Sequence, residues 1–179
     1  MIKYYNLALI PTHNRDQFIH YARVSSKTAP ADTYHIGGEA SIPHISLCHF
    51  TADPEQIDVI WQHVRDLDWP ALHMTFDQHR SKSYPNNPAR TDICWISLIP
   101  DHLEQLKERH LQVAEIIQHP LNASFEQYDP HMTLFNSRAT SACTKFNSQP
   151  QATPSISDDF TVALGFIDTV GQITELLYQ

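Results

Sequence analysis

The sequence of 179 residues is long enough for one compact folded unit and too short for two ordinary independent domains. Hydrophobic residues make up 41% of it and charged residues 18%, which excludes an intrinsically disordered chain because enough apolar surface is present to build a core. The formal net charge is −8 with only 12 Lys and Arg, which argues against a protein that holds long nucleic acid by neutralising many phosphates.

The N-terminal residues and the cysteines bear on the cellular compartment. Asn6 interrupts the apolar stretch near the start, so this region lacks the long apolar core of a signal peptide, and no later run reaches membrane-spanning length. Cys48, Cys94 and Cys143 are widely spaced and form no C-x-x-C, so we expect buried or unreactive thiols and neither a disulfide nor a zinc site. We therefore expect a cytoplasmic monomer with no membrane contact.

In the first half of the chain, strand and helix patterns alternate. The predicted elements are, in order, a strand over residues 4–11, a helix over 14–24, a strand over 42–50, a helix from 53 onwards and a strand over 71–80. Asp53 suits the N-cap of the second helix and Pro54 its first position. A turn-rich linker at residues 83–90 closes this half.

The second half repeats this order. The predicted elements are a strand over residues 93–100, a helix from 101 that ends before Pro120, a strand at 131–134, a polar loop over 137–159 and a hairpin over 160–178 that turns near Gly171. The block LIPTH at residues 9–13 also matches LIPDH at residues 98–102. These repeated patterns predict a duplicated unit with lobes at roughly 1–85 and 90–179 that exchange terminal strands.

Each repeat contains one short histidine motif. His44-Ile45-Ser46-Leu47 and His131-Met132-Thr133-Leu134 stand at nearly equal distances after the matched blocks, and a proline precedes each histidine. Residues i and i+2 of a strand point to the same side, so His44 lies beside Ser46 and His131 beside Thr133. If the two lobes face each other, all four polar side chains surround a space that one phosphate can fill.

Histidine suits acid–base chemistry at such a phosphate. Its ordinary pKa of about 6.5 allows one imidazole to act as a neutral base while the other, protonated, acts as an acid. The hydroxyls of Ser46 and Thr133 can donate hydrogen bonds to the phosphate oxygens. We expect no metal and no other cofactor, because the carboxylates near the motifs, Glu39 and Asp129, show no ligand spacing.

These motifs resemble those of the two-histidine (2H) phosphoesterase superfamily, which includes 2′-5′ RNA ligase-like proteins and cyclic nucleotide phosphodiesterases. The resemblance implies an α+β fold of two pseudo-symmetric lobes, each an antiparallel sheet with helices packed on its outer face, and an active-site cleft between them. It also implies that His44 and His131 are the acid–base pair and that Ser46 and Thr133 bind phosphate. The expected reaction is hydrolysis of a 2′,3′-cyclic or 2′-5′ phosphodiester in a small nucleotide or short oligonucleotide.

The sequence is also compatible with two other functions. The same site could catalyse 2′-5′ ligation of RNA, as in a 2′-5′ RNA ligase. Alternatively, the protein could be a non-catalytic module that binds nucleotides or a protein. A ligase needs more positive surface, and the sequence shows no basic cluster beside either motif; the candidates are Arg80, Lys82, Arg90 and Arg138. Three aromatic residues could stack on a base, although packing in the core is the commoner role: Tyr84, Phe125 and Tyr128.

The other histidines near these motifs are interpreted as structural. His73-Met74-Thr75-Phe76 has the shape of the motif but no partner in the repeat. His13 and His102 stand at predicted helix starts, where capping or exposure is expected. His49 is out of phase with His44 and Ser46, so its side chain is expected to point away from them.

Overall fold

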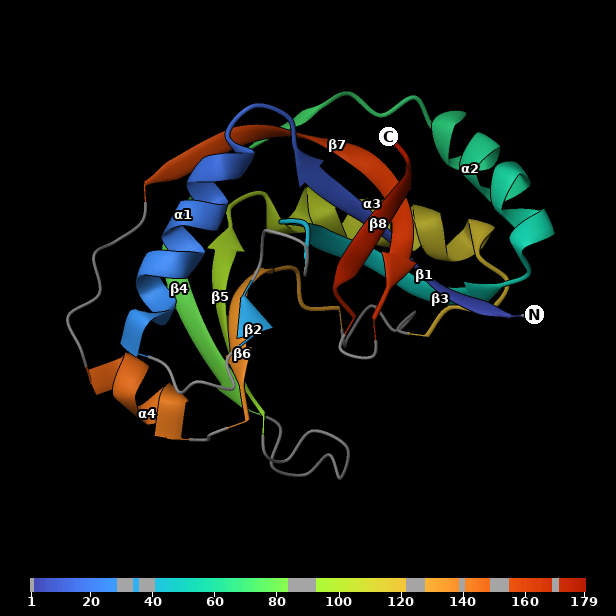
Figure 1. The fold of residues 1–179 in the computed structure, drawn as a ribbon. Coiled ribbons are helices and arrows are strands. Elements are labelled where there is room, and N and C mark those ends of the chain that lie inside the picture. Colours follow the sequence, from blue (N-terminus) through green and yellow to red (C-terminus); the bar gives the residue numbers. More distant parts are fainter. Residues whose placement is uncertain are drawn as a thin grey trace.

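The computed structural model describes residues 2–28, 34–35, 41–83, 93–121, 128–138, 141–148, 155–168 and 171–179 (Figure 1). The strands are β1 (Lys3–Pro11), β2 (Tyr34–His35), β3 (Ile45–Ala52), β4 (Leu72–Ser83), β5 (Cys94–Pro100), β6 (Met132–Ser137), β7 (Ile156–Ile167) and β8 (Ile173–Tyr178). The helices are α1 (Arg15–Ser25), α2 (Ile57–Arg65), α3 (Leu103–Ile116) and α4 (Ser141–Ser148), with 3-10 turns at Ser26–Thr28 and Pro54–Gln56.

The strands and helices predicted from the sequence are present, with their ends displaced by a few residues. Asp53 and Gln56 form a capping box ahead of α2, as the sequence of that turn favours. The predicted loop at residues 137–159 is wrong in two places, because it contains α4 and the first residues of β7. Most of the predicted linker, residues 84–90, lies outside the described part of the chain, as do Arg90, Tyr84 and Phe125.

All the strands belong to one antiparallel sheet whose pairings run in a closed circuit. The order is β1-β3-β6-β5-β4-β7, and β7 pairs again with β1; β8 extends from β7 and β2 from β6. Strand β7 pairs with β4 at Ile156–Phe160 and with β1 at Phe160–Phe166, and it arches over both parts of the sheet (Figure 1). This arrangement confirms the predicted antiparallel α+β fold.

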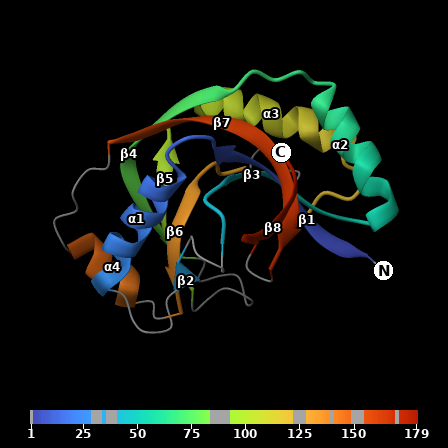
Figure 2. The same cartoon turned by 45° about the horizontal axis from the view of Figure 1, so that its top comes forward.

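The helices cover the outer side of this sheet in two groups. Helices α1 and α4 lie over β4, β5 and β6, whereas α2 and α3 lie together near β3 (Figure 2). Phe18 of α1 is fully buried and packs edge-on against Phe76 and Phe160. No helix of the described ranges is both long and apolar enough to cross a membrane.

Strands β3 and β6 meet at one residue pair, Ile45 opposite Met132, and this contact joins the two parts of the sheet. The division into lobes at roughly 1–85 and 90–179 stays a prediction. Strand β4, which falls in the first of these ranges, pairs with β5 and β7 of the second.

A β-bulge at the last residue of the histidine motif shifts the phase of β3. Ala8 of β1 is opposite Ser46, but the preceding Leu7 is opposite Cys48, so Leu47 is an extra residue in β3. A bulge of this kind turns the following side chains to the other face of the sheet. This phase shift decides where His49 points.

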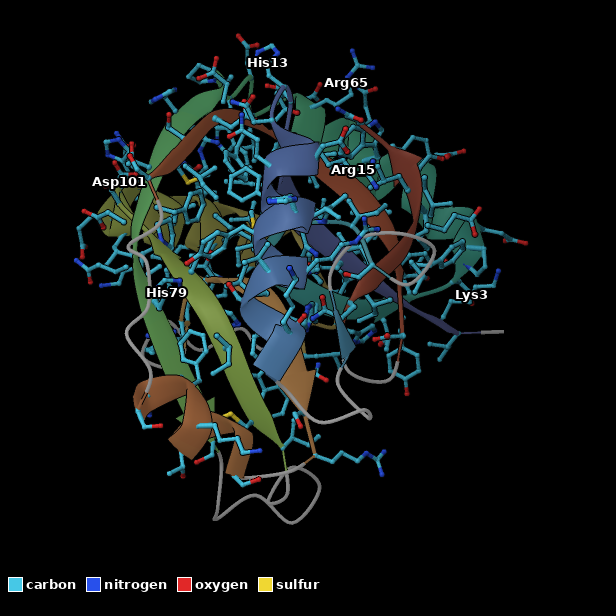
Figure 3. The ribbon with its side chains drawn as sticks, turned by 60° about the vertical axis from the view of Figure 1, so that its left-hand side comes forward. Lys3, His13, Arg15, Arg65, His79 and Asp101 are labelled. Atoms are coloured by element: carbon cyan, nitrogen blue, oxygen red, sulfur yellow. A yellow bond between two sulfur atoms is a disulfide. The ribbon has the colours of Figure 1, made fainter. Side chains whose placement is uncertain are left out.

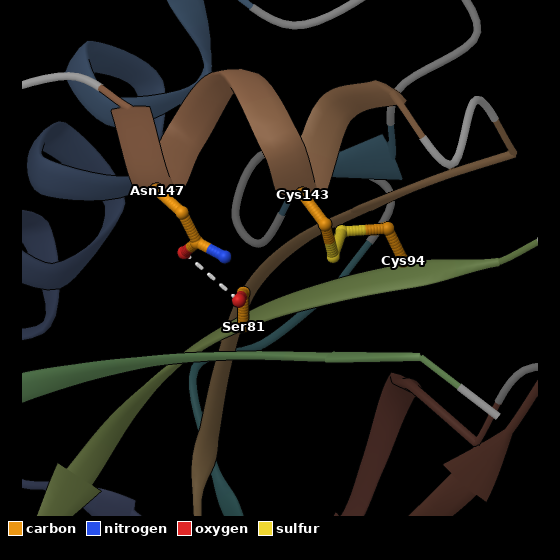
Figure 4. Close-up of a disulfide and its surroundings, with 4 residues drawn as sticks. All are labelled: Ser81, Cys94, Cys143 and Asn147. Atoms are coloured by element: carbon orange, nitrogen blue, oxygen red, sulfur yellow. Dashed lines mark hydrogen bonds between the residues drawn. A yellow bond between two sulfur atoms is a disulfide. The ribbon is translucent and has the colours of Figure 1, made fainter.

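Cys94 and Cys143 form a disulfide that joins β5 to α4 (Figure 4). The expectation of no disulfide was therefore wrong. Cys94 pairs with Ser137 at the end of β6, and α4 begins a few residues later, so the fold brings together two cysteines that are far apart in the sequence. Ser81 of β4 also donates a 2.9 Å hydrogen bond to Asn147 of α4. Cys48 is buried and free, as expected, and burial raises its pKa to about 12.

Replacing Cys143 with serine tests the contribution of the disulfide. Closing a loop of 49 residues restricts the unfolded chain. We expect Cys143→Ser to lower the free energy of unfolding by about 2–4 kcal/mol in oxidising buffer. Urea unfolding with and without dithiothreitol measures this free energy, and the reduced wild-type protein is the control. Equal stability of the two proteins in oxidising buffer would contradict the expected cross-link.

Candidate active site

The two histidine motifs hold their imidazoles in the same way. Nδ1 of His44 lies 2.6 Å from the carbonyl oxygen of Ile42, and Nδ1 of His131 lies 2.6 Å from the carbonyl oxygen of Asp129. A carbonyl can only accept, so each Nδ1 carries the proton in this bond. Each neutral ring therefore has its lone pair at Nε2, which is the nitrogen available for proton transfer.

The strand register sets the two motifs side by side. Ile45 is opposite Met132, and continuing this antiparallel register sets His44 opposite Thr133 and Ser46 opposite His131. Directly opposed residues project from the same face of a sheet, with their Cβ atoms about 4.5–5.5 Å apart. Each histidine thus has the hydroxyl of the other motif as its cross-strand neighbour. This register sets all four predicted site residues on one face of the sheet.

Burial keeps both imidazoles in their neutral form at neutral pH. It lowers the pKa of His44 to about 4, and the nearby His131 acts in the same direction, whereas Asp168 and hydrogen bonds to the Ile42 and Gly171 backbone oppose it. Burial also lowers the pKa of His131. The two rings interact electrostatically, as expected for groups that flank a common space.

A basic cluster lies beside His131, although the sequence showed none. Nη2 of Arg80 is 2.6 Å from one oxygen of the Asp129 carboxylate, and Nζ of Lys82 is 2.8 Å from the other. Both cations act to lower the pKa of His131, whereas the backbone and charge of Asp129 act to raise it. Two of the four candidate cations named from the sequence, Arg80 and Lys82, thus lie beside the second motif, although both come from β4, far from either motif in the sequence.

His49 contacts Ser46, contrary to the prediction that it points away. Nε2 of His49 lies 3.0 Å from Oγ of Ser46, and the amide of Asn6 donates a 2.8 Å hydrogen bond to the same oxygen. The prediction assumed an unbroken strand, whereas the extra residue Leu47 shifts His49 onto the face of Ser46. The Ser46 hydroxyl is therefore oriented by two side chains that motif reasoning missed.

We expect His49→Phe to lower kcat/KM for a phosphodiester substrate by about two- to tenfold, the value of one hydrogen bond. Phenylalanine keeps a ring against Gly171, where an added Cβ would lie 2.8 Å from the His49 ring, but it cannot bond Ser46. The matched experiment repeats the change in a Ser46→Ala background, where we expect no further loss. An equal loss in both backgrounds would show that His49 does not act through Ser46.

His110 of helix α3 and Tyr128 contact the backbone of the first motif. Nδ1 of His110 lies 2.6 Å from the Leu47 carbonyl oxygen, and Tyr128 donates a 3.0 Å hydrogen bond to the Ser46 carbonyl. The rings of His110 and Tyr128 stack with their centroids 4.1 Å apart, and both are buried. Tyr128 thus packs in the core, which is the commoner of the two roles considered for it.

The remaining candidate histidines lie elsewhere. His73 is exposed on β4 and bonds Asp159 at 2.8 Å, and His13, labelled near the top of Figure 3, is also near Asp159. His102 precedes α3 in a left-handed conformation, with φ of 54°. Among the described residues, no group of three or more His, Cys, Asp or Glu is placed to hold a metal ion.

Comparison with known proteins establishes the family. The sequence pattern of the 2′-5′ RNA ligase superfamily matches residues 13–163, and the chain belongs to this superfamily. No match is found among curated proteins.

Solved structures share the fold. Escherichia coli LigT complexed with 3′-AMP superimposes with a TM-score of 0.57 at 17% identity, covering 94% of this chain and 91% of LigT. LigT complexed with ATP gives a TM-score of 0.56 at 13% identity, covering 100% of this chain and 95% of LigT. A structure described as a phosphoesterase superimposes with a TM-score of 0.52 at 12% identity, covering 100% of this chain and 95% of the phosphoesterase.

Proposed function

We propose that the protein is a metal-independent phosphodiesterase that hydrolyses 2′,3′-cyclic or 2′-5′ phosphodiesters through His44 and His131. The observations that carry this proposal are the Ile45–Met132 pair, whose register sets the two motifs crosswise, and the electrostatic interaction between the His44 and His131 rings. Two proton-transfer groups and two hydroxyl donors on one face are what in-line displacement at a phosphate requires when no metal takes part. Membership of the superfamily supports the same chemistry.

In the proposed reaction, Nε2 of one histidine removes a proton from water as its oxygen attacks the phosphorus. The bond from phosphorus to the leaving ribose oxygen breaks, and Nε2 of the other histidine donates a proton to that oxygen. Ser46 and Thr133 donate hydrogen bonds to the two phosphate oxygens that do not react. The first histidine ends protonated and the second neutral, and exchange with solvent restores both.

The surroundings of the two rings favour His44 as the base and His131 as the acid. The pKa of His44 is lowered to about 4, by burial first, so this ring is neutral over most of the pH range. Burial lowers the pKa of His131, and Arg80 and Lys82 act in the same direction, whereas the carbonyl and carboxylate of Asp129 favour its protonated form. These opposed requirements predict a bell-shaped pH profile.

We expect kcat/KM to be highest between about pH 4 and pH 6.5. It rises with pH as the base loses its proton near 4, and it falls as the acid loses its proton at a pKa below the ordinary 6.5. The measurement is kcat/KM at constant ionic strength from pH 3.5 to 9, with unfolding monitored at each pH. A maximum above pH 7.5 would contradict the lowered pKa values.

A panel of substrates tests the proposed linkage. It contains 2′,3′-cyclic nucleotides, 2′-5′ and 3′-5′ dinucleotides, and RNA halves with the ends that a 2′-5′ ligase would join. We expect turnover of the cyclic or 2′-5′ members and none of the 3′-5′ dinucleotides. A joined RNA product would instead establish the ligase, and binding without any turnover would establish a non-catalytic module.

Small nucleotides are the proposed partners, because LigT was crystallised with ATP and with 3′-AMP. We also propose that the chain acts as a cytoplasmic monomer. The Cys94–Cys143 disulfide would then be open in the cell, since the cytosol keeps thiols reduced.

A further inference from the structure

We propose that Arg80 and Lys82 form a second anion subsite, which selects substrates that carry another phosphate one nucleoside away from the scissile phosphodiester. This inference rests on the proposed function, because it assumes that the scissile phosphate lies between the two motifs. It adds a substrate class, nucleotides with a second phosphate, that neither the motifs nor the family name specifies.

A row of polar residues runs across neighbouring strands of the sheet from the second motif to these cations. Thr133 of β6 is opposite Ser97 of β5, and Ser97 is opposite Arg80 of β4. Opposed residues share a face, so Ser97 and Arg80 lie on the face of His44 and Thr133. Lys82, two residues beyond Arg80, projects from the same face. Two strand spacings, roughly 10 Å, separate the backbones of Thr133 and Arg80, a distance that one nucleoside can bridge.

Asp129 holds both cations in place beside His131. Its two carboxylate oxygens bond Arg80 at 2.6 Å and Lys82 at 2.8 Å, while its backbone carbonyl bonds Nδ1 of His131. The three side chains carry a net charge of +1, and the two cationic ones are 36% and 40% exposed, so the cluster is positive and reachable from solvent. Cations that are already ordered lose less conformational entropy when an anion binds.

The local charge contrasts with that of the whole chain, which is −8. Two cations next to a histidine also disfavour its protonated form, and both act on His131 in this direction. The pair at the end of the polar row is suited to binding a phosphate group. The guanidinium of Arg80 can donate paired hydrogen bonds to the phosphate oxygens, and the ammonium of Lys82 can neutralise part of their charge.

The test compares a nucleoside 2′,3′-cyclic phosphate with and without a 5′-phosphate. We expect the wild-type protein to show a kcat/KM ratio that favours the 5′-phosphorylated form by tenfold or more. Arg80→Gln and Lys82→Met should each lower this ratio by about tenfold, the value of one charge-assisted hydrogen bond. Lys145→Met, at an exposed position of α4, is the matched control and should leave the ratio unchanged.

A merely structural cluster gives a different result. Arg80→Gln and Lys82→Met would then lower kcat/KM for both substrates by the same factor and leave the ratio at its wild-type value, which overturns the subsite. If the wild-type protein turns over neither substrate, the proposed function fails. Binding measured by calorimetry still tests whether the subsite exists. Tighter binding of a nucleoside 3′,5′-bisphosphate than of the 3′-monophosphate, lost in the two variants, supports it; equal binding refutes it.

Discussion

Replacing either His44 or His131 with alanine is expected to lower kcat/KM for a 2′,3′-cyclic nucleotide by about 10²–10⁴-fold, the usual contribution of one general acid or base. Each ring is held through Nδ1 by a backbone carbonyl, so alanine removes the only proton-transfer nitrogen at its position. Because the two groups act in one concerted step, the double variant should be little worse than the poorer single variant. Initial rates over a range of substrate concentrations measure these losses.

The sequence provides a matched control for this pair. His73 starts the look-alike motif His73-Met74-Thr75-Phe76, but its ring is exposed and bonds Asp159. We expect His73→Ala to retain wild-type activity. Circular dichroism and thermal unfolding of all variants exclude misfolding as the cause of a loss. An active His44→Ala or His131→Ala protein with a wild-type rate would remove that residue from the proposed mechanism.

Replacing Thr133 with valine is expected to lower kcat by about 10²–10³-fold, the effect of losing one donor to a developing oxyanion. Valine has nearly the shape of threonine, and Thr133 is buried, so the change removes a hydroxyl without opening a cavity. The loss should fall on kcat rather than on KM, because the phosphate oxygens gain negative charge in the transition state. Steady-state kinetics separate the two constants.

The control for Thr133→Val is Thr161→Val on β7. The Thr161 hydroxyl is buried and has no hydrogen-bond partner in the described part of the chain, so its removal should leave both stability and activity near wild type. Unchanged kcat in Thr133→Val would show that this hydroxyl does not contact the reacting phosphate.

Much of the fold could be predicted from local patterns. The strand at the N-terminus, the α2 turn with Asp53 and Pro54, and the closing hairpin at Gly171 each depend on residues close together in the sequence. The two motifs could be paired because they recur in a duplicated order. Within each motif, strand geometry alone predicted that the histidine and the hydroxyl point to the same side.

Features that depend on tertiary pairing could not be predicted in this way. One extra residue, Leu47, in β3 turns His49 toward Ser46, and a bulge has no clear local signal. Arg80 and Lys82 reach His131 only because β4 and β6 flank β5. Cys94 meets Cys143 through the packing of α4, a helix whose polar sequence resembles a loop.

The most direct test of the account is hydrolysis of a 2′,3′-cyclic nucleotide in excess EDTA by the wild-type protein and by the His44→Ala/His131→Ala double variant. We expect full turnover in EDTA, no stimulation by added Mg²⁺ or Zn²⁺, and near-complete loss in the double variant. Turnover that EDTA abolishes and metal restores, or that survives loss of both histidines, would contradict a metal-independent two-histidine phosphodiesterase.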